Sequence, residues 1–392
     1  MRYLSEAARQ IPRRERYDTV VAGGGIAGIA AALASARHGA KTLLIEREYT
    51  LGGLATLGLV TIYLPLCDGL GTQWCYGIVE ELLKLSISRG CEARYPTPWL
   101  EGGDREARAR TRYEVQFNAN LFALLAEQLL VEAGVEILYG TAAVAVHKEG
   151  DRISHVIVEN KSGRLAYPCG CAIDATGDAL LCLFAGEETA LYGPGNTPAG
   201  WYYHTKDGGI RLKMLGYAED PNVPAEYDGS LPHFAGVDAD EVSRMTLRSH
   251  ASTLRDFLSC GELTDTHALT AIAGIPQLRM TRRLVGRYTM DITEEHTRFE
   301  DSIGLITNWR RRGPVYELPY RILYGKTTNL AVAGRICSVT DKMWDISRVI
   351  PPCAVMGQAV GTAAALFGDF ATADVPTLQN ALVADGVLLH TK

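Results

Sequence analysis

The chain has 392 residues, 47% of them hydrophobic and 21% charged, which suits a globular protein with room for two domains. A net charge of −6 argues against nucleic acid as the main partner, and no stretch approaches the ~20 apolar residues of a membrane span. The first sixteen residues lack the apolar core of a secretory signal. The nine cysteines form no Cys-x-x-Cys pair and have no accompanying metal ligands, so we expect a cytoplasmic protein with reduced thiols and no metal.

Residues 17–28 predict a strand, a tight turn and the start of a helix. Thr19–Ala22 is a short apolar strand, and the turn after it has the spacing Gly23-x-Gly25-x-x-Gly28. The first glycine permits the tight turn, the second lets a pyrophosphate approach the backbone, and the third lets the helix pack closely on the strand. A phosphate placed there meets free N–H groups and the positive end of the helix dipole.

The context that such a turn requires is also present. A helix of small residues is expected over Ile26–Ala36, and a second strand over Lys41–Ile45 ends just before Glu46. An acid at this distance can hydrogen-bond the ribose hydroxyls of a dinucleotide. This context disfavours the alternative, a turn that binds no nucleotide. Besides the three glycines and Glu46, the nearby residues that we expect to contact a cofactor are Ile26, Ala27 and Arg47.

Helices and short strands alternate in the next part of the chain. Asn118 is expected to cap a helix over Ala119–Ala133, and a strand is expected at Val135–Leu138. Three short β segments follow, at 142–147, 152–159 and 164–168. A further strand then leads into the sequence Asp174-Ala-Thr-Gly-Asp178.

The composition changes between residues 189 and 313, where aromatic and turn residues gather. Asp238, with Glu241 three residues later, predicts a capping box for a helix that runs to about Leu258. We interpret this part as an inserted cap domain that contributes substrate contacts.

The cap supplies two candidates for proton transfer, Tyr203 and His204. A histidine has a suitable pKa, although a single one among aromatic residues is more often packed than catalytic. Several arginines at 279–287 are expected to anchor the cap to the rest of the chain through ion pairs.

The last part of the chain returns to the first domain. An apolar strand from Asn329 ends in Ala333-Gly-Arg335. The pair Pro351-Pro352 suits the first turn of a helix, where a missing N–H costs little, and the small-residue run 354–367 continues it.

The stretch after Glu46 sharpens the expected cofactor. The chain reads Gly52-Gly-Leu-Ala-Thr56 and continues to Val60. Here the sequence resembles the FAD-dependent oxidoreductases of the glutathione-reductase type. It is more similar still to those near the succinate dehydrogenase and fumarate reductase flavoproteins, which carry a Gly-Gly-Met/Leu-Ala-Thr-x-Gly-Leu-Val stretch. The resemblance extends from about Tyr17 to about Phe367.

This resemblance implies a set of FAD contacts. Glu46 would hold the adenosine ribose, and the backbone of Val144 would contact the adenine. The residues expected beside the phosphates and the flavin are Gly52, Gly53, Leu54, Ala55 and Thr56, then Ala175, Thr176 and Gly177, and finally Gly334, Arg335 and Pro352. The positive end of the helix whose first turn holds Pro351 and Pro352 would face the flavin pyrimidine and favour the anionic reduced ring.

We therefore expect an α/β fold. Its Rossmann-like FAD-binding domain, with a central parallel sheet and a small β-meander, would comprise residues 1–188 and 314–392, and an α+β cap would comprise residues 189–313. The expected activity is FAD-dependent hydride transfer between flavin N5 and a small organic substrate. The FAD is expected to be non-covalent, because Leu54–Thr56 lacks the histidine that attaches FAD in the succinate dehydrogenase class.

The electron partner is expected to be a quinone, a carrier protein or oxygen. No second strand–Gly-x-Gly-x-x-Gly–helix unit is present, so NAD(P)H should not bind on a domain of its own. Two alternatives stay open, a reductase of an activated C=C bond and a non-catalytic binding protein on an FAD-type fold. The intact glycine motifs argue against the second.

Arg348 is the expected substrate-binding residue, for a substrate with a carboxylate or carbonyl group. It lies just before the helix that should face the flavin, and fumarate reductases have an arginine in a similar place that holds a substrate carboxylate. A guanidinium suits this role because its planar fork pairs two oxygens at once. Arg348 could instead contact only FAD, or brace the loop 341–345 through an ion pair.

Overall fold

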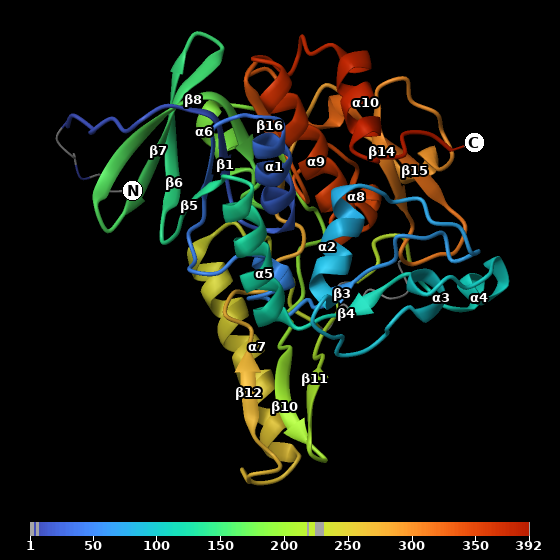
Figure 1. Ribbon diagram of the computed structural model, residues 1–392. Helices are drawn as coiled ribbons and strands as arrows, with labels where there is room; N and C mark the ends of the chain where they lie inside the picture. The colour runs from blue at the N-terminus through green and yellow to red at the C-terminus, as the bar shows by residue number, and fades with distance from the viewer. Residues whose placement is uncertain (1–3, 5–7, 218, 224–230, 392) are drawn as a thin grey trace.

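The computed structural model describes residues 4, 8–217, 219–223 and 231–391 (Figure 1). Its helices are α1 (Ile26–Arg37), α2 (Ile78–Ile87), α3 (Thr97–Leu100), α4 (Arg105–Arg110), α5 (Ala119–Glu132), α6 (Leu180–Ala185), α7 (Ala239–Ser259), α8 (Asp341–Ser347), α9 (Ile350–Leu366) and α10 (Val375–Ala384). Its strands are β1 (Tyr17–Ala22), β2 (Thr42–Ile45), β3 (Ile62–Tyr63), β4 (Val115–Gln116), β5 (Glu136–Leu138), β6 (Ala142–Glu149), β7 (Arg152–Asn160), β8 (Gly163–Asp174), β9 (Thr189–Leu191), β10 (Tyr202–Lys206), β11 (Gly209–Lys213), β12 (Leu269–Ile272), β13 (Arg282–Leu284), β14 (Ser302–Thr307), β15 (Val315–Pro319) and β16 (Leu330–Val332).

The largest sheet has seven strands in the order β5-β2-β1-β8-β7-β6, with β16 also paired to β8. The carboxyl half of β8 pairs in parallel with β1 and β16, and its amino half pairs antiparallel with β7. The predicted parallel sheet and β-meander are both present, and the segments predicted as separate strands before Asp174 form one strand. Gly170 lets β8 pass close to β1, because a Cβ there would lie 2.7 Å from the carbonyl oxygen of Asp18.

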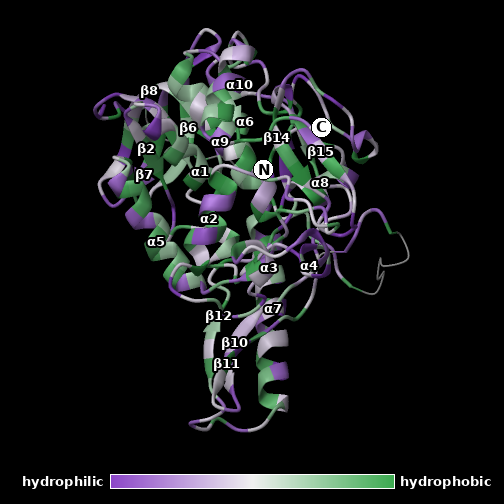
Figure 2. Ribbon diagram, turned by 45° about the vertical axis from the view of Figure 1, so that its right-hand side comes forward, coloured by the Kyte–Doolittle hydropathy of each residue, from purple (hydrophilic) through white to green (hydrophobic). Residues whose placement is uncertain are grey.

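Helices α1 and α9 contact each other backbone to backbone. A Cβ added at Gly357 would lie 2.3 Å from the carbonyl oxygen of Ala27, and one at Gly361 would lie 2.2 Å from that of Ala31. Both helices are rich in alanine and almost wholly buried, and Figure 2 shows hydrophobic residues along α9. Small residues therefore allow a helix contact that larger side chains would prevent.

The chain leaves this body and returns to it through neighbouring strands. β9 and β13 pair antiparallel, with Leu191 beside Arg282. Between them, β10, β11 and β12 form a three-stranded sheet that projects together with α7 (Figure 1). The side chain of Asp238 caps α7 by accepting the N–H of Glu241 at 2.9 Å. The carboxylate of Glu241 accepts instead from residues 235–236, so the predicted capping box is only half formed.

The predicted division at residue 313 falls inside a hairpin. β14 and β15 pair antiparallel on either side of it, and β14 packs on α9. The domain boundaries at 188 and 313 stay a prediction.

Two helix starts agree with the sequence. The side chain of Asn118 accepts the N–H of Leu121 at 3.0 Å at the start of α5, and Pro351 and Pro352 lie in the first turn of α9.

Within the described residues, no single helix is long and apolar enough to cross a membrane. α8 and α9 reach that length and apolarity only as a pair bent by 88°.

The contact between α1 and α9 predicts a large cost for any side chain at its centre. We expect Gly357→Val to lower the free energy of unfolding by at least ~3 kcal/mol, because the added atoms would overlap the backbone of α1. Gly368→Val is the matched control, since a Cβ there has nothing within 4 Å, and should change it by less than ~0.5 kcal/mol. Urea denaturation followed by circular dichroism measures both, and equal stabilities would contradict the packing argument.

Candidate functional site

The glycine turn at the end of β1 is packed on two sides and open on the third. Gly23 has φ +102°, and a Cβ there would lie 2.4 Å from the carbonyl oxygen of Ala175. A Cβ at Gly28 would lie 1.8 Å from the carbonyl oxygen of Gly23. At Gly25, in contrast, a Cβ would have nothing within 4 Å. Gly25 therefore faces open space, as the predicted approach of a pyrophosphate requires.

Glu46 is held in position by two backbone groups. Its Oε2 accepts the N–H of Gly24 at 2.6 Å, and its Oε1 accepts the N–H of Glu48 at 2.8 Å. The side chain is buried, yet it lines a cavity of about 230 Å³. A carboxylate oxygen has two lone pairs, so each can accept a ribose hydroxyl as well.

A second turn is fixed by the buried carboxylate of Asp174 at the end of β8. Asp174 accepts the N–H and the hydroxyl of Thr176, at 3.1 and 2.7 Å, and the N–H of Cys182 at 3.0 Å. Burial raises the pKa of Asp174. These bonds hold residues 175–177 at the same sheet edge as the glycine turn, because β8 and β1 are parallel.

A third segment joins this turn through Arg335. Its Nε donates to the carbonyl oxygen of Gly177 at 2.6 Å, and its Nη2 lies 3.3 Å from a carboxylate oxygen of Asp178. Gly334, beside it, has φ +85°, and a Cβ there would lie 2.8 Å from Ala27 in α1. The three segments predicted to share one cofactor thus meet in space.

Two adjoining cavities run along these segments. The larger has a volume of about 620 Å³ and the smaller about 230 Å³. The residues that line both are Gly25, Leu54, Ala175, Gly177 and Arg335. Two adjoining cavities that share the glycine turn and residues 175–177 suit a dinucleotide.

Most of the predicted cofactor residues line these cavities. Those on the larger are Gly25, Ile26, Ala27, Gly52, Leu54, Ala55, Ala175, Gly177, Gly334 and Arg335. Those on the smaller are Gly23, Gly25, Glu46, Arg47, Gly53, Leu54, Ala175, Thr176, Gly177 and Arg335.

Four predicted cofactor residues line neither cavity. Gly28 serves the helix contact, and Pro352 is buried in the first turn of α9. The hydroxyl of Thr56 donates to the carbonyl oxygen of Leu51 at 2.5 Å. Val144 falls where the register of β6 against β7 shifts, and the smaller cavity is lined instead by Thr141, Ala142 and Ala143.

Arg348 lines the larger cavity and is paired with a buried acid. Asp345 binds both Arg348 and Arg310, the latter at 2.5 Å. Although burial alone would raise it, these two arginines lower the pKa of Asp345. The Nε of Arg348 is buried and has no hydrogen-bond partner among the described residues. The predicted ion pair to residues 341–345 therefore exists, although these residues form helix α8 and not the expected loop, and one donor of the fork is left for another group.

Arg279 is a second arginine in the larger cavity, and it lacks an acidic partner in the described part of the chain. It is 7% exposed, donates to Gln277 at 2.6 Å, and lies 5.4 Å from the ring centre of Trp201. Burial, and then the charge of Arg348, lower the pKa of Arg279, but a guanidinium keeps its proton in proteins. The cavity therefore carries a positive charge that forms no ion pair with a carboxylate of the described residues.

The sequence predicted ion pairs for this arginine group, and only part of the group makes them. Arg283 lies 3.9 Å from Asp341, as expected for an anchor. Nothing in the sequence separated Arg279 from Arg283, because the difference depends on which carboxylates the fold brings near. The remaining walls of the larger cavity include Ile62, Leu64, Trp201, Met214, Tyr217 and Trp309.

The two candidates for proton transfer line neither cavity. The hydroxyl of Tyr203 contacts Thr61 at 3.0 Å and Glu92 at 2.7 Å, and burial raises its pKa. His204 packs beside His267, and burial, followed by the charge of His267, lowers its pKa.

The open space at Gly25 gives a test of the cofactor site. We expect Gly25→Val to raise the Kd for FAD at least about a hundredfold, because the side chain would fill the path of the phosphates. Flavin absorbance per protein measures retention, and the melting temperature of the flavin-free protein should match that of flavin-free wild type. Gly368→Val should retain the flavin. A Gly25→Val protein that stays fully loaded would refute the assignment.

Comparison with known proteins found partial similarity to a curated sequence and to solved structures. A "Thioredoxin reductase" of Ureaplasma parvum serovar 3 is 33% identical over 75 residues, which is 19% of this chain and about a quarter (24%) of that reductase. A geranylgeranyl bacteriochlorophyll reductase-like structure from Thermoplasma acidophilum matches with a TM-score of 0.45 and 13% identity, over 95% of this chain and 80% of that one. The flavin-dependent brominase Bmp2 triple mutant matches with a TM-score of 0.46 and 12% identity, over 94% and 84%.

The profile of one protein family covers nearly the whole chain. It is described as "FAD dependent oxidoreductase" and matches residues 18–198 and 201–382. Those ranges contain every segment that builds the two cavities. The chain belongs to the family of FAD-dependent oxidoreductases.

Proposed function

We propose that this oxidoreductase transfers a hydride between flavin N5 and a small organic substrate that carries a carboxylate or a carbonyl group. The observation that carries the proposal is the buried charge of Arg279 in the larger cavity, without a carboxylate partner among the described residues. A buried charge is costly unless it is paired, so an anionic or strongly polar substrate group would relieve that cost.

The two cavities would divide the cofactor between them. The smaller one, with Glu46, suits the adenosine, and the larger one suits the flavin together with the substrate. FAD, when bound, supplies the group that accepts or donates a hydride. We propose that it is held non-covalently, because the lining residues include no histidine. Val349, Ile350 and Cys353 bring the positive end of α9 to the larger cavity, which favours negative charge there.

Substrate binding would use two arginines and an apolar wall. Arg279 offers a buried charge that has no ion pair among the described residues, and Arg348 offers the donor left over from its pair with Asp345. Trp201 and Trp309 line the same space and would cover an apolar substrate body. A substrate with an acidic end and an apolar or aromatic remainder fits this distribution best.

The proposal for the electron partner is based on the dinucleotide-binding turns among the described residues. The one strand–glycine–helix turn of the dinucleotide type there is that of β1 and α1, so NAD(P)H has no domain of its own. We propose a quinone, a carrier protein or oxygen as the partner. The same cavity could serve the reduction of an activated C=C bond, and reoxidation of the reduced flavin by enoates would favour that second function.

An anaerobic screen tests the proposed function directly. Purified holoenzyme is mixed with carboxylates and carbonyl compounds that have an apolar remainder, and loss of flavin absorbance identifies a reductant. NADH and NADPH are included, and rapid stoichiometric bleaching by either would contradict the proposed electron partner. Activity only with cationic compounds would contradict the proposed substrate class.

Loss of the unpaired charge should weaken substrate binding. We expect Arg279→Met to raise KM for the anionic substrate at least about tenfold, because a charge-assisted hydrogen bond in a buried site is lost. The control is Arg283→Met, which also removes a partly buried arginine packed on a tryptophan but lies outside the cavity. Steady-state kinetics with flavin content measured in parallel should separate the two. Equal effects of the two changes would contradict the role of Arg279.

The role of the planar guanidinium group of Arg348 in substrate binding can be tested with a substitution that keeps its positive charge. We expect Arg348→Lys to raise KM about tenfold at full flavin occupancy, since an ammonium cannot bind Asp345 and the substrate with the same geometry. If flavin is lost instead, Arg348 belongs to the cofactor site. Unchanged KM and kcat would show that it only braces Asp345.

A further inference from the structure

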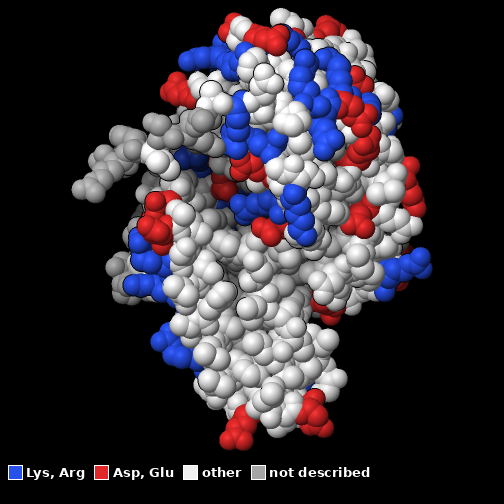
Figure 3. All heavy atoms as spheres, turned by 90° about the vertical axis from the view of Figure 1, so that its left-hand side faces the viewer, with Lys and Arg blue, Asp and Glu red and all other residues white. Residues whose placement is uncertain are grey.

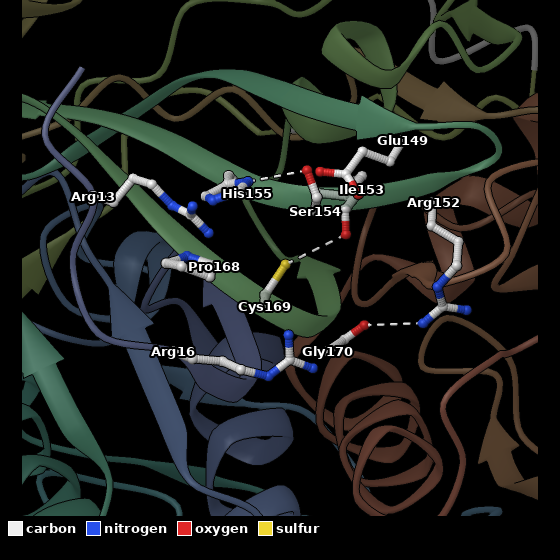
Figure 4. Close-up of a pocket in the computed structure, with 10 residues that line it drawn as sticks. All are labelled: Arg13, Arg16, Glu149, Arg152, Ile153, Ser154, His155, Pro168, Cys169 and Gly170. Atoms are coloured by element: carbon white, nitrogen blue, oxygen red, sulfur yellow. Dashed lines mark hydrogen bonds between the residues drawn. The ribbon is translucent and has the colours of Figure 1, made fainter. Parts of the chain in front are cut away.

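A separate pocket of about 330 Å³ lies at the opposite end of β1 from the cofactor turn. β1 has six residues, so the two sites lie roughly 20 Å apart along the strand. The residues that line the pocket are Arg13, Arg16, Glu149, Arg152, Ile153, Ser154, His155, Pro168, Cys169 and Gly170 (Figure 4). Three of them are arginines, and their side chains reach in from three sides around Cys169.

The N-terminal segment is fixed where it forms this pocket. The carbonyl oxygen of Pro12 accepts the N–H of Ala166 at 3.0 Å, and the N–H of Arg14 donates to the carbonyl oxygen of Ala166 at 2.9 Å. Arg13, between them, pairs with Ala166 as a parallel bridge. These backbone hydrogen bonds therefore hold Arg13 beside β8.

Two of the three arginines form no ion pair in the described part of the chain. Arg152 donates to the carbonyl oxygen of Gly368 at 2.6 Å and lies 3.9 Å from Asp369. Arg13 and Arg16 have no ion pair or side-chain hydrogen bond in the part of the chain that the structure describes. Glu149 is the one acid that lines the pocket. Figure 3 shows other basic side chains on this face, over the β-meander, among acidic ones.

His155 adds a buried polar atom that lacks a partner. Its Nδ1 lies 3.0 Å from the hydroxyl of Ser154, whereas its Nε2 is buried and without a hydrogen-bond partner among the described residues. Burial, and then the charge of Arg13, lower the pKa of His155, with Glu149 acting in the opposite direction. An anion in the pocket would offset the charge of Arg13 and could bind the Nε2 atom in its protonated form.

We propose that this pocket binds a dianionic phosphate group, either inorganic phosphate or a phosphate monoester. Two guanidinium groups without an ion pair among the described residues match two negative charges, and their forks suit tetrahedral oxygens. The position of the pocket separates it from the cofactor phosphates, which belong at the carboxyl end of β1. A bound phosphate would tie the N-terminal segment to β7 and β8.

A cation is the less favoured occupant of the same corner. Ligand atoms of His147, Glu149 and His155 lie within 4.8 Å of one another. The neighbouring charges of Arg13 and Arg152 oppose a metal ion there and favour an anion.

Calorimetric titration of the FAD-loaded enzyme tests the proposal. Inorganic phosphate and glycerol 3-phosphate are titrated separately, in chloride buffer of constant ionic strength with a chelator present. We expect saturable one-site binding, weakened at least about tenfold by Arg13→Ala and by Arg16→Ala, since each removes a charge-assisted contact. Arg14→Ala is the matched control on the same segment, outside the pocket, and should bind as wild type does.

The outcomes separate two sources of the phosphate group. Tighter binding of glycerol 3-phosphate supports a monoester as ligand, and tighter binding of inorganic phosphate supports the free ion. The proposal is overturned if neither binds, if Arg14→Ala weakens binding as much as Arg13→Ala, or if binding occurs only without the chelator. Both arginines are exposed, so the variants should keep the wild-type melting temperature and flavin content.

Discussion

The backbone contact between α1 and α9 decides where the cofactor can bind. Both helices point their N-termini at the same cavity, since residues 26 and 27 of α1 and residues 350 and 353 of α9 line it. Their closeness depends on Gly357 and Gly361, which leave no room for a Cβ. Two helix dipoles therefore act on one space, and each contributes partial positive charge to it. A wider separation of the helices would remove one dipole from the cavity.

Strand β8 connects this cavity to the remainder of the sheet. Its carboxyl end holds Asp174, whose bonds shape the turn beside the cofactor, and its amino half carries the meander. A shift of the strand by one residue would turn each side chain to the other face, so its register is strongly fixed. Pairing on both sides thus places the turn of residues 175–177 opposite the glycine turn.

The cofactor half of the site could be predicted because it depends on short local patterns. The spacing of Gly23, Gly25 and Gly28 reports a turn, and the turn is what the cofactor needs. Whether Arg279 has an acidic partner depends on neighbours far away in the sequence, which no local pattern reveals. The adenine contact near Val144 stays a prediction, and the register shift of β6 beside it, next to the cavity-lining residues 141–143, could not be read from the residues alone.

The pairing of β9 with β13 makes the projecting part an insertion with adjacent entry and exit points. Most of the cofactor walls come from the body, whereas the insertion supplies Trp201, Met214, Tyr217 and Arg279 to the larger cavity and Ile275, Pro276 and Leu278 to the smaller one. Closing a loop costs free energy that grows only logarithmically with its length. Evolution could therefore lengthen, shorten or exchange this segment without rebuilding the sheet, and chemistry at the flavin and choice of substrate could diversify independently.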